Sequence, residues 1–161
     1  MLKLSLNADK LRALTVKLRE AGSKPIDRDT AKLIGTTTIK LMRELIASGN
    51  SPIYGKGKFP KYKDPKRYPG KKKSHEPVNL YLSGDFLKSL DYKLIPDKIG
   101  FKTKVGYFED DQLVKEQGHR KGTNKQPKRP TIPKGKEEYV KAIRSAIVEI
   151  YQKRINKLLK G

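Results

Sequence analysis

Three consecutive carboxylates, Glu109, Asp110 and Asp111, are the strongest candidates for catalysis in the sequence. They follow a strand-like run, where oxygen ligands could hold Mg²⁺ in a nuclease while lysine-rich loops bind the phosphodiester. The structural alternative is that the acids begin a helix over 109–117, because the helix dipole favours negative charge at its N-terminus. No distant second acid with a supporting lysine motif accompanies them, so we favour the structural alternative and predict no catalytic residues.

Metal binding has little support. The two histidines, His75 and His119, lie far apart in basic loops, and neither has a carboxylate at ligand spacing. The chain has no cysteine, which excludes disulfides and thiolate metal sites. We expect His119 to follow a helix end, where an imidazolium is tolerated, and we predict no metal site.

Two short motifs are weaker candidates. Ser83-Gly84-Asp85 has no paired histidine with an orienting acid, and its glycine context does not match a nucleophile elbow. Gly55-Lys56-Gly57-Lys58 lacks the spacing of a phosphate-binding loop and is not followed by a helical pattern. We therefore predict no cofactor site and no enzymatic activity.

Two basic segments remain. From residue 56 to residue 73 there are nine Lys or Arg and one acid, with interleaved aromatic residues Tyr54, Phe59, Tyr62 and Tyr68. The aromatic rings could stack single-stranded bases, but we favour rings that attach a proline-rich arm to its own domain or to a neighbour. The candidate contacts to DNA or to a protein partner are Lys56, Lys58, Lys61, Lys63, Lys66, Arg67, Lys71, Lys72, Lys73, Arg120, Lys121, Lys125 and Lys128.

Composition indicates one domain, 1–161, with arm insertions at about 50–79 and 119–136. Hydrophobic residues make up 35% of the chain and charged residues 34%, a small core beneath a highly charged surface. The net charge of +21 attracts polyanions, of which nucleic acid is the usual one, although acidic protein partners and solubility are alternatives. No signal peptide or membrane-spanning run is visible, so we expect a soluble protein, intracellular when made, with no membrane contact.

These residues must be positioned by a small α+β fold. Apolar periodicity and capping residues predict helices over 8–21, 27–48, 84–90, 109–117 and 137–159. Strands are predicted over 92–95 and 99–107, with a turn at 96–98. The expected fold is a small antiparallel sheet packed against long N- and C-terminal helices, with long basic loops. Gly35 and the threonines after it could bend the second helix, Ser83 could cap the third, and Gly118 could end the fourth.

The order of motifs in residues 80–133 resembles phage virion-morphogenesis, tail-completion and head–tail joining proteins. The shared pattern is a leucine–glycine turn, a hairpin ending in valine-glycine, a helix ending in glutamine-glycine, and an arginine-proline exit. The resemblance covers about a third of the chain. The positions that carry it are Leu82, Gly84, Leu87, Leu90, Val105, Gly106, Gln117, Gly118, Arg129, Pro130 and Ile132.

Two features depart from that family pattern. Leu113-Val114-Lys115-Glu116 stands where an aromatic-alanine pair is usual, and the 50–79 insertion is longer and more basic. The resemblance implies a structural protein of the virion neck or tail, made in the host cytoplasm. Copies would form a ring, a hexamer or dodecamer, between connector or adaptor proteins and the tail, around the channel for genomic DNA. The alternative from another class is a sequence-nonspecific nucleic-acid-binding protein.

Overall fold

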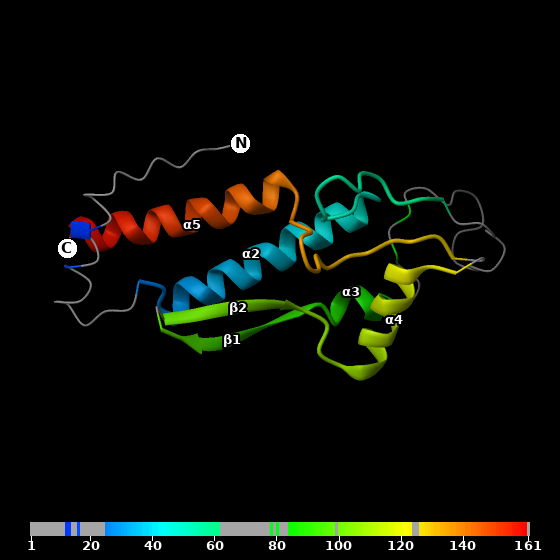
Figure 1. The fold of residues 1–161 in the computed structure, drawn as a ribbon, viewed down its shortest axis with the longest axis horizontal. Coiled ribbons are helices and arrows are strands. Elements are labelled where there is room, and N and C mark those ends of the chain that lie inside the picture. Colours follow the sequence, from blue (N-terminus) through cyan, green and yellow to red (C-terminus); the bar gives the residue numbers. More distant parts are fainter. Residues whose placement is uncertain are drawn as a thin grey trace.

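The structure, a computed structural model, describes residues 12, 13, 16, 25–61, 78, 80, 84–98, 100–123 and 126–160. The predicted helix over 8–21 lies outside this part except for three residues, and most of the predicted arm at 50–79 lies outside it too. Figure 1 shows three layers, with helix α2 between helix α5 and a β-hairpin. The fold is α+β, a small antiparallel sheet packed against long helices, as predicted.

The central helix, α2, spans Arg28–Ala47 and confirms the predicted helix over 27–48. It begins where the Asp27 carboxylate accepts a hydrogen bond from the backbone N–H of Thr30 at 2.8 Å. It ends before Gly49, whose φ of 80° lets the chain turn away. The helix runs without a break through Gly35 and the threonines that follow.

The hairpin consists of β1, Asp91–Asp97, and β2, Gly100–Gly106, paired antiparallel. The prediction of a turn at 96–98 was wrong, because Pro96 and Asp97 belong to β1 and pair with Phe101 and Gly100. One face of the hairpin packs on α2, where the Thr103 hydroxyl donates to the carbonyl of Ala31 at 2.8 Å. Alternation along 101–105 is confirmed, with the lysines exposed.

The C-terminal helix, α5, spans Lys141–Lys160 and lies along α2 (Figure 1). Ile143 is fully buried, and Arg154 of α5 pairs with Asp27 at the start of α2, at 2.9 Å. The predicted start at residue 137 was wrong. Residues 138–140 instead pair with residues 52–54 through backbone hydrogen bonds, Tyr54 N–H to Glu138 O and Val140 N–H to Pro52 O.

Two shorter helices lie beyond one end of the hairpin (Figure 1): α3, Asp85–Lys88, and α4, Asp110–Lys121. The N-cap of α3 is Gly84 in the left-handed region at φ 88°, one residue later than predicted, and Ser83 lies outside the described residues. The prediction that α4 ends before Gly118 was wrong, since the helix continues to Lys121 and is capped by Gly122 at φ 64°. No helix in the described part of the chain is both long and apolar enough to span a bilayer.

The core lies where all these elements meet. Its buried residues include Met42 and Ile46 of α2, Leu90, Tyr107 and Ile143. The described parts of the two predicted arms also contribute to it, through fully buried Ile53, buried Phe59 and fully buried Thr131. Residues 51–53 and 59 and residues 129 and 131 are therefore packed into the protein, whereas residues 54–58 and 60 stay exposed.

Candidate functional site

The two basic segments converge on one cavity of about 310 Å³. Lys56 and Lys58 come from the loop after α2, Arg120 from the last turn of α4, and Lys128 from the segment that follows. Four of the candidate contact residues thus share one site although they are up to 72 positions apart in sequence (56 to 128). The other residues that line the cavity are Ser51, Phe59, Pro60, Pro130 and Glu137.

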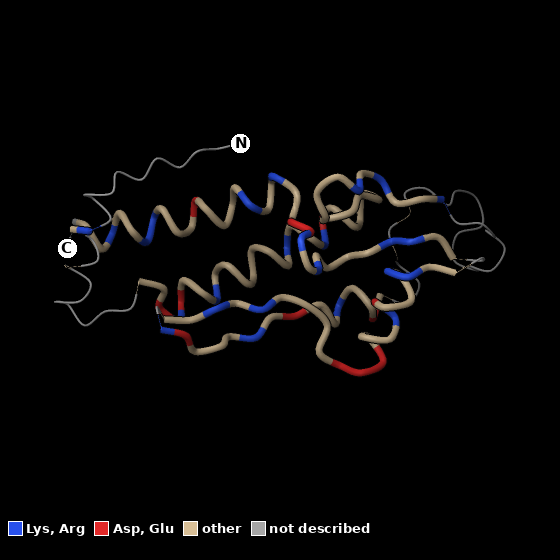
Figure 2. The backbone as a smooth tube through the Cα atoms, in the orientation of Figure 1, with Lys and Arg blue, Asp and Glu red and all other residues tan. Residues whose placement is uncertain are grey.

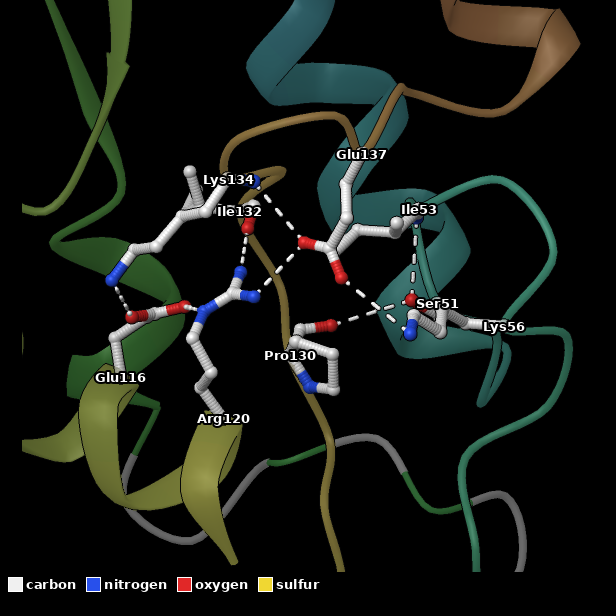
Figure 3. Close-up of polar contacts among 9 residues, drawn as sticks. All are labelled: Ser51, Ile53, Lys56, Glu116, Arg120, Pro130, Ile132, Lys134 and Glu137. Atoms are coloured by element: carbon white, nitrogen blue, oxygen red, sulfur yellow. Dashed lines mark hydrogen bonds and ion pairs between the residues drawn. The ribbon is translucent and has the colours of Figure 1, made fainter.

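A buried carboxylate pairs with Arg120 of the cavity lining (Figure 3). Glu116 of α4 is 2% exposed, and its Oε1 lies 3.2 Å from Nε of Arg120, one turn later. Its Oε2 accepts from Nζ of Lys134 at 3.1 Å. The Arg120 guanidinium also donates to the carbonyl of Ile132. Since breaking a buried ion pair leaves an uncompensated charge, this triad fixes the 132–134 segment against α4.

A second carboxylate, Glu137, joins the remaining cations (Figure 3). Its Oε2 accepts from Nη1 of Arg120 at 2.9 Å and from the backbone N–H of Lys134 at 3.1 Å, and its Oε1 lies 3.5 Å from Nζ of Lys56. Burial acts to raise the pKa of Glu137, but these hydrogen bonds and the Arg120 charge outweigh it and lower the pKa. Glu137 therefore stays ionised and connects the two basic segments.

Neutral contacts also join the two basic segments (Figure 3). The Ser51 hydroxyl donates to the carbonyl of Pro130 at 3.3 Å and accepts from the N–H of Ile53 at 3.2 Å. Ile53 also forms an antiparallel bridge with Tyr139. The two walls of the cavity are thus held together by backbone and side-chain bonds.

Arg129 lies within the protein rather than on an arm. It is 1% exposed, its Nε donates to the carbonyl of Pro60 at 2.9 Å, and its backbone N–H donates to the carbonyl of His119 at 2.6 Å. A buried arginine is uncommon, and its neighbours in the sequence are those of a solvated loop. Its burial was missed because only the tertiary contacts of the 126–132 segment reveal it.

His119 lies inside α4, so its predicted place after a helix end was wrong. Burial and the nearby positive charge of Arg129 lower the pKa of His119 to about 4. The side-chain amide of Gln126 contacts Nδ1 at 2.8 Å, and the ring packs 5.1 Å from that of Phe86. The histidine is therefore a neutral packing residue at neutral pH, and the expectation of a tolerated imidazolium was also wrong.

The cavity lining retains positive charge that its carboxylates do not neutralise. Both carboxylates hold Arg120, whereas no carboxylate in the described part of the chain pairs with Lys58 or Lys128, which are exposed. An oxyanion, such as a phosphate or the carboxylate of a partner, is the group that these lysines and this shape suit. Lys61 and Lys121 are also exposed, and the remaining candidate contacts, Lys63, Lys66, Arg67, Lys71, Lys72, Lys73 and Lys125, lie outside the described residues.

The candidate catalytic acids are separate from this cavity. Glu109 is the N-cap of α4, and Asp110 and Asp111 form its first turn, as the dipole argument predicts. The Asp111 carboxylate pairs with Lys115 at 3.4 Å. Within the described ranges no group of three or more histidines or acids could hold a metal ion.

The segments that carry the family resemblance meet at the core. Leu90 is 1% exposed, and Leu87, Val105 and Ile132 pack against the core residues. Arg43 of α2, which the sequence did not single out, holds the leucine–glycine turn: its Nε donates to Leu87 O at 3.1 Å, and its Nη2 to Lys88 O and Leu90 O, each at 3.0 Å. Gly106 ends β2, Gln117 and Gly118 lie within α4, Pro130 lines the cavity, and Leu82 lies outside the described residues.

Comparisons with protein-family models, with curated proteins and with solved structures find no match to this chain.

Proposed function

We propose that the chain is a structural virion protein of a tailed phage, which forms a ring at the head–tail junction and links the connector to the tail around the DNA channel. One observation carries the proposal: the four segments of the family pattern pack against one another. Phe86 of the leucine–glycine turn stacks on Tyr107, after the valine-glycine, with ring centroids 4.5 Å apart. Phe86 also packs on His119, after the glutamine-glycine, and the His119 carbonyl accepts from Arg129 of the exit.

This arrangement favours assembly over turnover. The pattern residues that lie in the described part of the chain are mostly packing residues: Leu90 is buried, Leu87 and Val105 partly so, and Arg129 bonds to backbone carbonyls. A scaffold that presents charged loops at a fixed geometry is what a ring subunit needs. The net charge of +21 suits a channel that DNA passes through, or an acidic connector surface.

The alternative, a sequence-nonspecific nucleic-acid-binding protein, is favoured by the cavity that gathers Lys56, Lys58 and Lys128. A metal-dependent nuclease built on Asp110 and Asp111 is a third candidate. It requires Mg²⁺-dependent cleavage by the wild-type protein and its loss when both residues are changed to alanine, so absence of cleavage by the wild type ends that candidate.

Titration of the purified protein with duplex DNA, across a range of salt concentrations, separates the first two candidates. A ring protein is expected to bind isolated DNA weakly, because the lysines act only when many copies surround the channel. Micromolar or tighter binding by a monomer with a steep salt dependence would favour the alternative.

Two double variants, matched in the charge they remove, show whether any DNA binding takes place at the cavity. Lys58→Gln with Lys128→Gln should lower the salt slope by about one per lost phosphate contact if the cavity binds the backbone. Lys40→Gln with Lys98→Gln removes the same charge from exposed positions that do not line the cavity, and it should leave the slope unchanged if the cavity is the binding site.

A further inference from the structure

The glycine–lysine motif Gly55-Lys56-Gly57-Lys58 lacks the spacing of a phosphate-binding loop, yet it lies at the cavity between the two basic segments. Gly55 and Gly57 have φ values of 78° and 61°, in the left-handed region that glycine adopts without strain. The chain passes through these two turns, and both lysines of the motif line the cavity. The motif is therefore part of the site, although its spacing in the sequence does not indicate this.

Backbone hydrogen bonds hold Lys58 in position. The N–H of Ser51 donates to the carbonyl of Gly57, and the N–H of Phe59 donates to the carbonyl of Gly49, each at 2.8 Å. The backbone on both sides of Lys58 is therefore fixed to the end of α2 and the residues that follow it. Because the fold supplies this order in advance, only the side chain of Lys58 must be ordered when it binds a ligand.

Lys128, from the second basic segment, is held in a similar way. The backbone N–H of the next residue, Arg129, donates to the carbonyl of His119 at 2.6 Å. Cγ of Lys128 lies 3.0 Å from the position that a β-carbon at Gly122 would occupy, and Gly122, at φ 64°, is the C-cap of α4. The glycine thus leaves room for the aliphatic part of the Lys128 side chain beside the end of the helix.

The cavity has an excess of positive charge. Its lining includes four cations, Lys56, Lys58, Arg120 and Lys128, and one carboxylate, that of Glu137. Glu137 pairs with Arg120 and Lys56, whereas Lys58 and Lys128 form no ion pair within the described part of the chain. Figure 2 shows the basic stretches of these segments at the same end of the molecule, away from the end of α5. Two like charges that line one small cavity repel each other, so a bound anion would relieve that repulsion.

We propose that this cavity binds the phosphate group of a small phosphate monoester, or inorganic phosphate, between Lys58 and Lys128. Its volume of about 310 Å³ lies at the lower end of the range of small-molecule sites. A phosphate monoester carries a charge of about −1.5 to −2 at neutral pH and three acceptor oxygens, so both lysines can donate to it at once. Phe59, Pro60 and Pro130 supply an apolar wall, which excludes water and strengthens the attraction.

A phosphate monoester suits this site better than a carboxylate or the backbone of DNA. A carboxylate has one negative charge, which leaves one of the two lysines without compensation. Each phosphodiester of duplex DNA also has one charge, and it lies on a convex surface that exposed lysines reach without any cavity. The inference goes beyond the proposed ring, because a ring subunit needs no small ligand. Each of the two can fail without the other.

Titration of the purified protein with inorganic phosphate tests the site. Isothermal titration calorimetry at neutral pH and constant ionic strength should show saturable binding of one phosphate per chain. Lys58→Gln and Lys128→Gln should each weaken this binding about tenfold, because each removes a charged donor. Lys40→Gln and Lys98→Gln are the matched controls, exposed lysines that do not line the cavity, and should change the affinity by less than about twofold. No saturable binding by the wild type, or equal losses in the controls, would overturn the proposal.

Two further measurements do not depend on the lysine variants. In heteronuclear NMR spectra of the wild type, phosphate should shift the amide resonances of Gly57, Lys58 and Lys128 more than those of the hairpin. The largest shifts in the hairpin would overturn the proposed location. Dimethyl phosphate, a diester with one charge, should bind about tenfold more weakly than inorganic phosphate, since it can compensate only one lysine. Equal affinities for the two would overturn the preference for a monoester.

Discussion

Gly35 in the middle of α2 lies against the ring of Tyr92 on β1. A β-carbon at residue 35 would be 2.5 Å from Cγ of Tyr92 and within 2.8 Å of both Cδ atoms. The contact allows the hairpin to approach the helix closely, and it explains why a poor helix former occupies a helix interior. The close packing of the sheet on α2 therefore requires a glycine at residue 35.

Gly35→Ala should lower the free energy of unfolding by about 1–3 kcal/mol, because the ring of Tyr92 is contacted at Cγ and both Cδ atoms, the end nearest the backbone, and cannot move aside without shifting the hairpin. Gly118→Ala in α4 is the control. No atom lies within 4 Å of a β-carbon there, so this change should raise the free energy of unfolding by up to about 1 kcal/mol through helix propensity. Urea denaturation measures both, and equal effects of the two changes would contradict the close approach.

Arg43→Met should destabilise the protein by about 1 kcal/mol, because the partly buried bond to the carbonyl of Leu90 is lost, whereas water can replace the exposed bonds to Leu87 and Lys88. Arg43→Lys should recover only part of this loss, since an ammonium cannot reproduce the guanidinium fork. Lys40→Met, at an exposed position on the same helix, should change stability by less than about 0.5 kcal/mol. If Lys40→Met has the same effect as Arg43→Met in urea denaturation, Arg43 does not anchor the turn.

Glu116→Gln should lower the free energy of unfolding by about 3 kcal/mol, because Arg120 and Lys134 lose their common buried carboxylate. Lys115→Gln, the neighbouring residue, breaks only the exposed pair with Asp111 and should have an effect below about 1 kcal/mol. Thermal unfolding followed by circular dichroism compares the two. A small effect at Glu116 would mean that the network does not hold the cavity walls together.

Stability should fall as the pH falls from about 6.5 to about 4. The pKa of His119 is lowered to about 4 in the folded state, so the unfolded chain binds more protons in this window and is favoured by acid. The loss is at most about 3 kcal/mol, at 1.36 kcal/mol per unit. Protonation of Nδ1 would also place a second donor against the Gln126 amide.

His119→Gln should remove most of this pH dependence between pH 5 and pH 7, above the range in which the acids titrate. Denaturant midpoints at both pH values provide the measurement. An unchanged dependence in the variant would show that another group is responsible.

Local sequence patterns were sufficient to predict helix α2 and the two strands of the hairpin. Asp27 caps the start of α2, and Gly49 follows its end. The alternation of apolar and lysine residues along β2 indicates that one face of the strand packs on a helix. The hairpin turn was misplaced because Pro96 has the composition of a turn residue but pairs within β1, at an edge where a missing N–H is tolerated.

Tertiary contacts explain the other errors. Residues 138–140 have helical periodicity, but pairing with 52–54 removes them from α5. The α4 helix extends past Gly118 because two contacts stabilise its last turn. These are the ion pair between Glu116 and Arg120 and the hydrogen bond that the backbone N–H of Arg129 donates to the carbonyl of His119. The convergence of Lys56, Lys58, Arg120 and Lys128 on one cavity depends on those same long-range contacts, which no local pattern reports.

The most direct test of the proposed ring is a cryo-EM reconstruction of tailed-phage particles from cells that produce this chain. The account predicts a closed ring of copies of this chain between the connector and the tail. A complete particle in which this chain contributes no density at the head–tail junction would contradict it.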